Sequence, residues 1–178
     1  GRLGAVNSSF VNNTSSDWDD GNFGNVTGFN AATVNMSWTN HREWLISPSF
    51  DLGTENYALS FDIAMTLPGN SDPTILDPDD TVAFVISTDN GLTWNNTNIL
   101  QMWTGGNVIP TTGTHVEIVL SAYSGIVKIG IYAGSSLSVN SKLICVDNFF
   151  ITKSSACLKP YQLSAANVTA NAFDLSWD

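Results

Sequence analysis

The sequence has few positive charges and lacks any long apolar run. Six Lys and Arg residues stand against sixteen Asp and Glu, which gives a formal net charge of −10 at pH 7. Nucleic acid is therefore excluded as an expected partner, since its recognition needs a basic surface. A membrane-spanning helix needs about 18 or more consecutive apolar residues, and none occurs. The first residues also lack the apolar core of a signal peptide, so we expect an internal or processed piece of a longer protein.

Cysteine is scarce as well. Cys145 and Cys157 have neither CxxC spacing nor a neighbouring His cluster, which argues against a thiolate zinc site and against redox chemistry. A disulfide between them would require an oxidising compartment. Because Cys145 lies in the apolar run 143–146, we favour two unpaired thiols, with Cys145 buried.

Helical periodicity is absent, and short runs of β-branched and aromatic residues take its place. These runs predict strands at 43–47, 57–65, 81–87, 116–120, 127–133 and 143–152. Turn residues separate them, and Asn90-Gly91 predicts a tight hairpin from 82–87 to a strand near Trp94. Strands at this spacing without helices predict an all-β fold, a two-sheet antiparallel jelly-roll sandwich.

The composition changes after Thr152. Residues 153–160 predict a polar linker that ends in Pro160, and residues 161–178 return to alternating apolar positions. This last segment resembles the opening strands of a fibronectin type III domain. Two strands cannot bury a sandwich interior alone, so we expect a truncated second domain at 161–178 that continues in the natural protein.

Residues 17 to 152 carry a second resemblance, made of ordered segments. The chain resembles the MAM-like jelly-roll modules of Bacteroidota, which include the cleaved adhesin and choice-of-anchor J modules. The matching segments are 17–23, 43–52, 79–94, 120–125 and 146–151. We therefore assign residues 1–152 to one such module.

This resemblance implies a secreted or cell-surface protein of many domains, exported by the type IX system. Members of the family serve in adhesion and in polysaccharide-associated roles. We expect a non-catalytic module for adhesion or carbohydrate recognition, whose partners are a polysaccharide or surface glycan and the neighbouring domains of the same chain. Two alternatives stay open, a structural spacer in a tandem array and an accessory domain of a secreted hydrolase.

Acidic residues in loops predict a structural calcium ion. The predicted ligands are Asp19 and Asp20 near the start, Asp80 before a strand, and Asp147 in the last strand of the module. Crowded carboxylates favour a hard cation with six to eight oxygen ligands. Because the first and last strands of a jelly roll are often neighbours, Asp19 or Asp20 is expected to meet Asp147. The alternative is that these carboxylates only solvate turns or accept backbone hydrogen bonds.

Exposed aromatic rings predict a sugar site, because sugars stack apolar faces on them. Trp18, Trp38 and Trp103 lie near predicted loops and are the candidate platforms, although core packing is the alternative for each. Trp44, Trp94 and Trp177 are expected in cores.

Catalysis has no sequence support. The two histidines, His41 and His115, lie in no recognised catalytic motif, so we expect no enzyme. The segment Asp80-Thr81-Val82 resembles a Bacteroidota O-glycosylation motif, which makes Thr81 a candidate glycan acceptor. A glycan at Thr81 would compete with a metal at Asp80.

Overall fold

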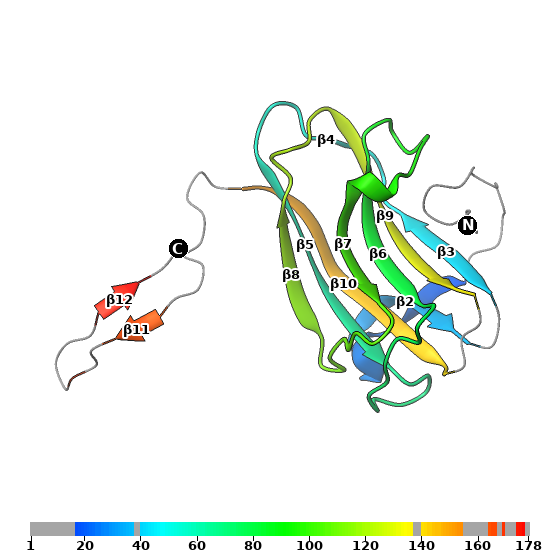
Figure 1. Ribbon diagram of the computed structural model, residues 1–178. Coiled ribbons are helices and arrows are strands. Elements are labelled where there is room, and N and C mark those ends of the chain that lie inside the picture. The colour runs from blue at the N-terminus through cyan, green and yellow to red at the C-terminus, as the bar shows by residue number, and fades with distance from the viewer. Residues whose placement is uncertain are drawn as a thin grey trace.

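A computed structural model shows two packed antiparallel sheets, as the strand spacing predicts (Figure 1). The structure describes residues 17–37, 40–136 and 140–154, Thr169, and the short strands 164–166 and 174–176. The predicted all-β jelly-roll sandwich is confirmed. In the described part of the chain, no helix is long and apolar enough to cross a membrane.

The first sheet has the strand order β1-β2-β10-β5-β8. Its strands are β1 (Trp18–Asn22), β2 (Asn30–Met36), β10 (Lys142–Lys153), β5 (Tyr57–Thr66) and β8 (Thr114–Val119). A 3-10 turn, η1 (Phe23–Asn25), follows β1.

The second sheet has the order β3-β9-β6-β7, and β4 also pairs with β9. Its strands are β3 (His41–Ile46), β9 (Ile126–Ser135), β6 (Thr81–Ser87), β7 (Ile99–Thr104) and β4 (Phe50–Asp51). A short 3-10 turn, η2 (Asn96–Asn98), precedes β7. Consecutive strands cross repeatedly between the sheets, which is the jelly-roll pattern.

The core lies between the sheets, where apolar side chains of alternating strand positions meet. Phe61 of β5 stacks on Phe84 of β6, with ring centroids 3.7 Å apart and planes 7° from parallel. Trp103 of β7 packs its edge against both rings, at 6.5 and 6.2 Å. This aromatic group joins the two sheets at the middle of the sandwich.

The six strands predicted from the apolar runs are present within a few residues of their predicted ends, but the predicted hairpin is wrong in one respect. Asn90 and Gly91 do take positive φ angles, 60° and 85°. The segment that follows is a loop, and the partner of β6 is β7, which begins only at Ile99. The reason is Asp89, whose carboxylate accepts hydrogen bonds from the backbone N–H groups of Leu92 and Thr93 and so holds the loop away from strand pairing.

Aromatic residues cover the outer face of the second sheet. Trp44, Trp94 and Tyr132 are 2%, 6% and 7% exposed, and the Trp44 ring lies 5.1 Å from each of the other two. The predicted core placement of Trp44 and Trp94 is therefore confirmed, whereas Trp177 lies outside the described residues. Gly130 of β9 leaves room for both indoles, because a Cβ there would lie 2.7 Å from each.

This packing predicts that Gly130→Ala destabilises the fold by about 1–3 kcal/mol, since the added methyl overpacks two rigid rings. Urea melts measure the change in the free energy of unfolding. The control is Trp94→Phe, which shrinks one ring: the double variant should lose less stability than the sum of the two single variants. Simple additivity would contradict the proposed contact.

Cys145 is buried as a free thiol. Its burial agrees with the prediction for this residue, whereas Cys157 lies outside the described residues. Farther along the chain, β11 (Ser164–Ala166) and β12 (Asp174–Ser176) pair antiparallel and form a two-stranded sheet of their own. The boundaries at 152 and 160 and the fibronectin-like second domain stay predictions.

Candidate functional site

The outer side of the first sheet carries a polar and aromatic surface on β10, β5 and β8. Leu59, Phe61 and Ile63 of β5 are buried in the core. Because successive strand residues point to opposite faces, Ser60 and Asp62 point outward. We call this surface the open face, and it consists of Ser60, Asp62, His115, Glu117, Asp147, Asn148 and Phe150.

Strand register brings these residues into two neighbouring rows. Phe150 of β10 pairs with Ser60, which in turn pairs with Glu117 of β8. The next row contains Asp147 of β10, Asp62 of β5 and His115 of β8, paired across the three strands. The rows are about 7 Å apart along the strands, two residues at about 3.4 Å each.

Asp62 is the centre of a hydrogen-bond network on the open face. Its Oδ1 lies 2.7 Å from Nδ1 of His115, and its Oδ2 accepts a 2.6 Å hydrogen bond from the Asn148 side-chain amide. The amide of Asn148 and, beside it, His115 hold the pKa of Asp62 below its usual range, although burial acts in the opposite direction. Asp62 is therefore an ionised, fixed acceptor at neutral pH.

A β-bulge in β10 sets the position of Asn148. The register with β5 shifts between Asp147 and Phe150, and Asn148 takes a φ of 50°. Asn tolerates this left-handed conformation better than most residues, and the Asp147 carboxylate accepts a 2.7 Å hydrogen bond from its backbone N–H. Bulges re-aim side chains, and this one holds the Asn148 amide against Asp62.

Phe150 supplies the aromatic surface of the open face. Its neighbours Phe149 and Ile151 pack against the core, so Phe150 points outward and is 56% exposed. Its partner across the strands, Ser60, is small and polar. An exposed ring beside fixed carboxylate, amide and imidazole groups can stack an apolar ring face and hydrogen-bond hydroxyl groups at its edge.

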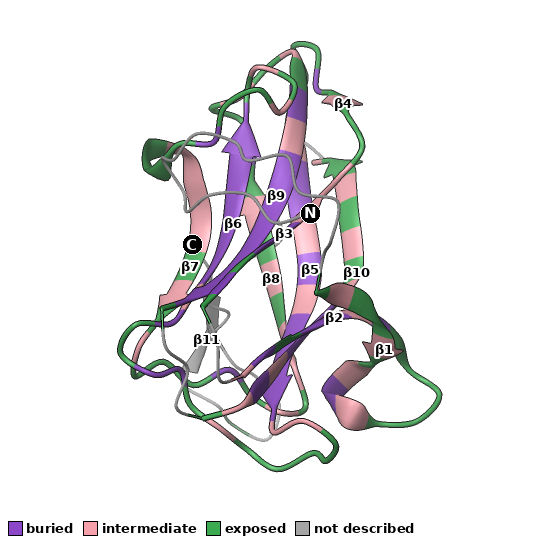
Figure 2. Cartoon of the chain, turned by 90° about the vertical axis from the view of Figure 1, so that its right-hand side faces the viewer, coloured by how far each residue is buried: buried purple, intermediate pink, exposed green. Residues whose placement is uncertain are grey.

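The two sheets differ in how much of their outer side they expose. In Figure 2, β8 and the C-terminal half of β10 show exposed and half-buried residues, whereas β6 and β9 are almost entirely buried. The outer side of the second sheet is covered by its own aromatic cluster. The open face is thus an accessible sheet surface that carries an ordered hydrogen-bond network, the one centred on Asp62.

The predicted Trp platforms do not lie on the open face. Trp18 and Trp103 are partly buried and pack against the core, while Trp38 lies outside the described residues. Trp18 does line an open depression of about 440 Å³, together with Asp20 and Leu45. Their role in sugar binding stays a prediction.

The predicted meeting of Asp20 with Asp147 is wrong. Strand β2 lies between β1 and β10, so that Asp20 pairs with Ala32, and Ala32 pairs with Val146. Since Val146 is in the core, Asp147 points to the outer face, whereas Asp20 shares the side of Trp18, which packs on the core. Asp19 accepts the backbone N–H of Asp20, at 2.9 Å. The structure does not bring these three carboxylates together.

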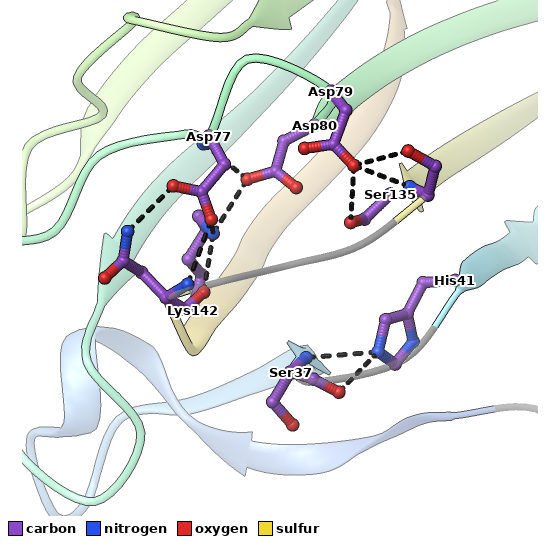
Figure 3. Close-up of polar contacts among 9 residues, drawn as sticks. Ser37, His41, Asp77, Asp79, Asp80, Ser135 and Lys142 are labelled. Carbon is purple, nitrogen blue, oxygen red and sulfur yellow. Dashed lines mark hydrogen bonds and ion pairs between the residues drawn. The ribbon is translucent and has the colours of Figure 1, made fainter.

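The partner of Asp80 is the ammonium group of Lys142 (Figure 3). The side chains of Lys142 and Asp80 are fully buried, and the Lys142 ammonium lies 2.8 Å from Asp80 and 2.7 Å from Asp77. Burial alone would raise the pKa of Asp77, but hydrogen bonds from Lys142 and Asn140 hold it well below its usual range. An ammonium at this place would repel Ca²⁺, so this arrangement does not support Asp80 as a calcium ligand.

We predict that Lys142→Met destabilises the fold by about 3–5 kcal/mol, because it leaves two carboxylates without the ammonium between them. Thermal or urea melts measure the loss. Adding Asp77→Asn and Asp80→Asn should recover part of it. The control is Lys153→Met, which removes a pair with Glu55 whose side chains are both 60% exposed, and it should leave the stability almost unchanged because water screens that pair. Equal losses in the two Lys variants would contradict the role of the buried pair.

Calcium binding itself stays a prediction. If Asp19, Asp20 or Asp147 holds Ca²⁺ with help from backbone carbonyls, adding CaCl₂ to chelator-treated protein should raise the melting temperature. Replacing the carboxylate that holds the ion, by Asp19→Asn, Asp20→Asn or Asp147→Asn, should then abolish the rise. A melting temperature that does not respond to Ca²⁺ would argue against a structural calcium ion.

Thr81 is the first residue of β6 and pairs with Thr104 on one side and Gly134 on the other. Its side chain is half-buried. O-glycosylation at Thr81 stays a prediction.

The sequence interpretation missed the residues of the open face. The alternation of Leu59, Phe61 and Ile63 was a usable signal, since it directs Ser60 and Asp62 outward. Phe150 was harder to place, because the bulge at Asn148 changes which residues of β10 face the core.

Comparison with known proteins gives structural likenesses only. No protein-family model matches the chain, and no curated protein matches it. A cleaved adhesin domain, K3 of Lys-gingipain from Porphyromonas gingivalis w83, is 14% identical with a TM-score of 0.47, over 70% of this chain and 74% of that one. A CBM4 structure is 14% identical with a TM-score of 0.45, over 78% and 95% of the two chains. TmCBM61, solved in complex with β-1,4-galactotriose, is 14% identical with a TM-score of 0.44, over 72% and 73%.

Proposed function

We propose that this chain is a non-catalytic carbohydrate-recognition module and that the open face binds its glycan. The observation that carries the proposal is the exposed Phe150 ring beside the Asp62, His115 and Asn148 network. The ring supplies stacking for the apolar face of a sugar. The network supplies hydrogen-bond groups whose directions are already fixed, so little ordering is needed when a sugar binds.

The chemistry of the open face favours a glycan without negative charge. Asp62 is ionised, and the exposed Glu117 lies in the neighbouring row of the same face. The whole chain carries a net charge of −10. An anionic polysaccharide would meet repulsion from these charges, whereas neutral hydroxyl groups can donate to the carboxylates.

The position of the open face suits a polymer better than a small sugar. Its residues lie on the side of a sheet, across the three neighbouring strands β10, β5 and β8. A long chain can lie across such a surface. This fits the proposed setting, a secreted or cell-surface protein of several domains in which the module holds a polysaccharide while other domains act.

We predict that Phe150→Ala weakens glycan binding by about tenfold or more, equivalent to about 1.4 kcal/mol, because aromatic anchors contribute most at binding surfaces. Glycan arrays of neutral and anionic polysaccharides identify a ligand, and isothermal titration then measures affinity. Asp62→Asn, which keeps the shape but removes the charge, should also weaken binding.

The matched control is Leu92→Ala, which removes another exposed apolar side chain, 77% exposed, from the loop after β6. It should leave binding unchanged. Equal affinity of the Phe150→Ala variant and the unmodified protein would place the site elsewhere. If no glycan binds at all, the carbohydrate proposal fails and a spacer role is favoured.

A further inference from the structure

Two carboxylates and one amine meet inside the sandwich, where β10 begins. Asp77 and Asp80 lie in the segment before β6, and Lys142 is the first residue of β10 (Figure 3). The side chains of Lys142 and Asp80 are fully buried, and that of Asp77 is 9% exposed. We propose that Lys142 and Asp80 condense to form an amide bond, which ties the two sheets covalently. The proposal does not depend on glycan binding by the open face.

A tight turn brings the two carboxylates to the same amine. The backbone N–H of Asp80 donates a 2.9 Å hydrogen bond to the carbonyl oxygen of Asp77, and Pro78 stands at the position where proline favours such a turn. Gly105, after β7, packs so closely on this turn that a Cβ there would collide with Cα of Pro78. The turn is therefore closely packed, and its two carboxylates are held against Lys142 of β10.

The amine of Lys142 lies at contact distance from both carboxylates. Nζ is 2.8 Å from Oδ2 of Asp80 and 2.7 Å from Oδ2 of Asp77. It also donates a 2.5 Å hydrogen bond to the backbone oxygen of Asn140, so its position is fixed from a third side. An oxygen at hydrogen-bond distance places the carboxyl carbon that carries it close to Nζ. Fixed contact of this kind removes much of the entropy cost of a condensation.

The two carboxylates differ in their hydrogen bonds. Asp77 accepts hydrogen bonds from the backbone N–H and the side-chain amide of Asn140, at 3.0 and 2.8 Å. Although burial raises the pKa of Asp77, hydrogen bonds from Lys142 and Asn140 keep this pKa well below its usual range. Oδ1 of Asp80, by contrast, is buried and accepts no hydrogen bond from the described residues. A buried oxygen without a donor disfavours the carboxylate form, so Asp80 is the group that takes up a proton and becomes the electrophile.

The reaction needs only the groups that meet here. A proton passes from the ammonium of Lys142 to the carboxylate of Asp80, which gives a neutral amine and a neutral acid. The nitrogen lone pair then attacks Cγ of Asp80, and the C–N bond forms. Oδ2 of Asp77, 2.7 Å from the nitrogen, accepts the proton that the nitrogen must lose and delivers it to the departing hydroxyl, so that the Cγ–O bond breaks and water leaves. One ammonium and one carboxylate thus become one amide and one water, without an oxidant or other co-reactant.

The surroundings favour the neutral product. Lys142 pairs with Met36 of β2, and Leu76 precedes Asp77; these two apolar residues are 0% and 1% exposed. Charges are costly in such an interior, and conversion of the ion pair to an amide removes two of them.

The bond would join elements that are far apart in the sequence. Asp80 adjoins β6 of the second sheet, whereas Lys142 belongs to β10 of the first. A cross-link between residues 80 and 142 restricts the unfolded chain between them, and this restriction stabilises the folded state.

The test is intact-mass spectrometry of the whole chain under denaturing conditions. We expect a mass one water molecule below that of the sequence, and protease digestion should yield two peptides joined through Lys142 and Asp80. Lys142→Arg keeps the positive charge but cannot form the bond, because a guanidinium does not lose its proton in proteins. This variant should show its full sequence mass, and its melting temperature should be lower by about 10 °C or more.

Substitutions of the two acids identify which one reacts. In Asp80→Asn the amine attacks a carboxamide, so this variant should lose ammonia in place of water, a result that an unfolded chain cannot give. Asp77→Asn removes the proton acceptor and should keep its full sequence mass. The matched control is Lys153→Arg. Lys153 also lies 2.7 Å from a carboxylate, that of Glu55, but both side chains are 60% exposed, so this variant should lose one water as the unmodified chain does.

Three results would overturn the proposal. The first is a folded, unmodified protein that keeps its full sequence mass. The second is a loss of water that persists in Lys142→Arg, which would indicate a cyclic imide at another residue. The third is a loss of ammonia in Asp77→Asn and not in Asp80→Asn, which would exchange the roles of the two acids.

Discussion

The stack of Phe61 on Phe84 is the contact on which the sidedness of the whole sandwich depends. It joins β5 of one sheet to β6 of the other at a centroid distance of 3.7 Å. A strand cannot turn one residue inward without turning the next one outward, and a shift of one residue would reverse every side chain. By placing Phe61 inside, the core places Ser60 and Asp62 outside. The proposed binding surface is therefore a consequence of core packing.

The sequence was sufficient for the strands whose patterns are local. The apolar runs at β5, β6 and β9 are enough to predict these strands, because a short run of apolar residues indicates a buried strand without any knowledge of its partners. The turn at Asn90-Gly91 was also predictable, because Asn and Gly tolerate the positive φ angles that both residues adopt here. The strand expected near Trp94 was not found, because the carboxylate of Asp89 and the packing of the Trp94 ring on Trp44 hold that segment as a loop.

Site residues were harder to predict because their partners are distant in the sequence. Asp80 resembles a metal ligand in its local segment, and only the fold shows that the Lys142 ammonium lies beside it. Asp20 and Asp147 were expected to meet, but the strand order places β2 between them. The bulge at Asn148 is equally hard to predict from a local segment. Phe150 faces outward because of how β10 and β5 are paired, which the sequence of β10 alone does not determine.

The carboxylates described above differ in whether the fold pairs them with a buried ammonium or leaves them exposed to a ligand. Asp77 and Asp80 share the ammonium of Lys142 inside the sandwich, and these groups are closed to any partner. Asp62 is held by the neutral amide of Asn148 and by the half-exposed imidazole of His115, and it retains access to solvent. A carboxylate that is oriented but not neutralised can still accept hydrogen bonds from hydroxyl groups. This difference in local charge balance, more than the number of acidic residues, is what distinguishes a binding surface from a structural ion pair in this chain.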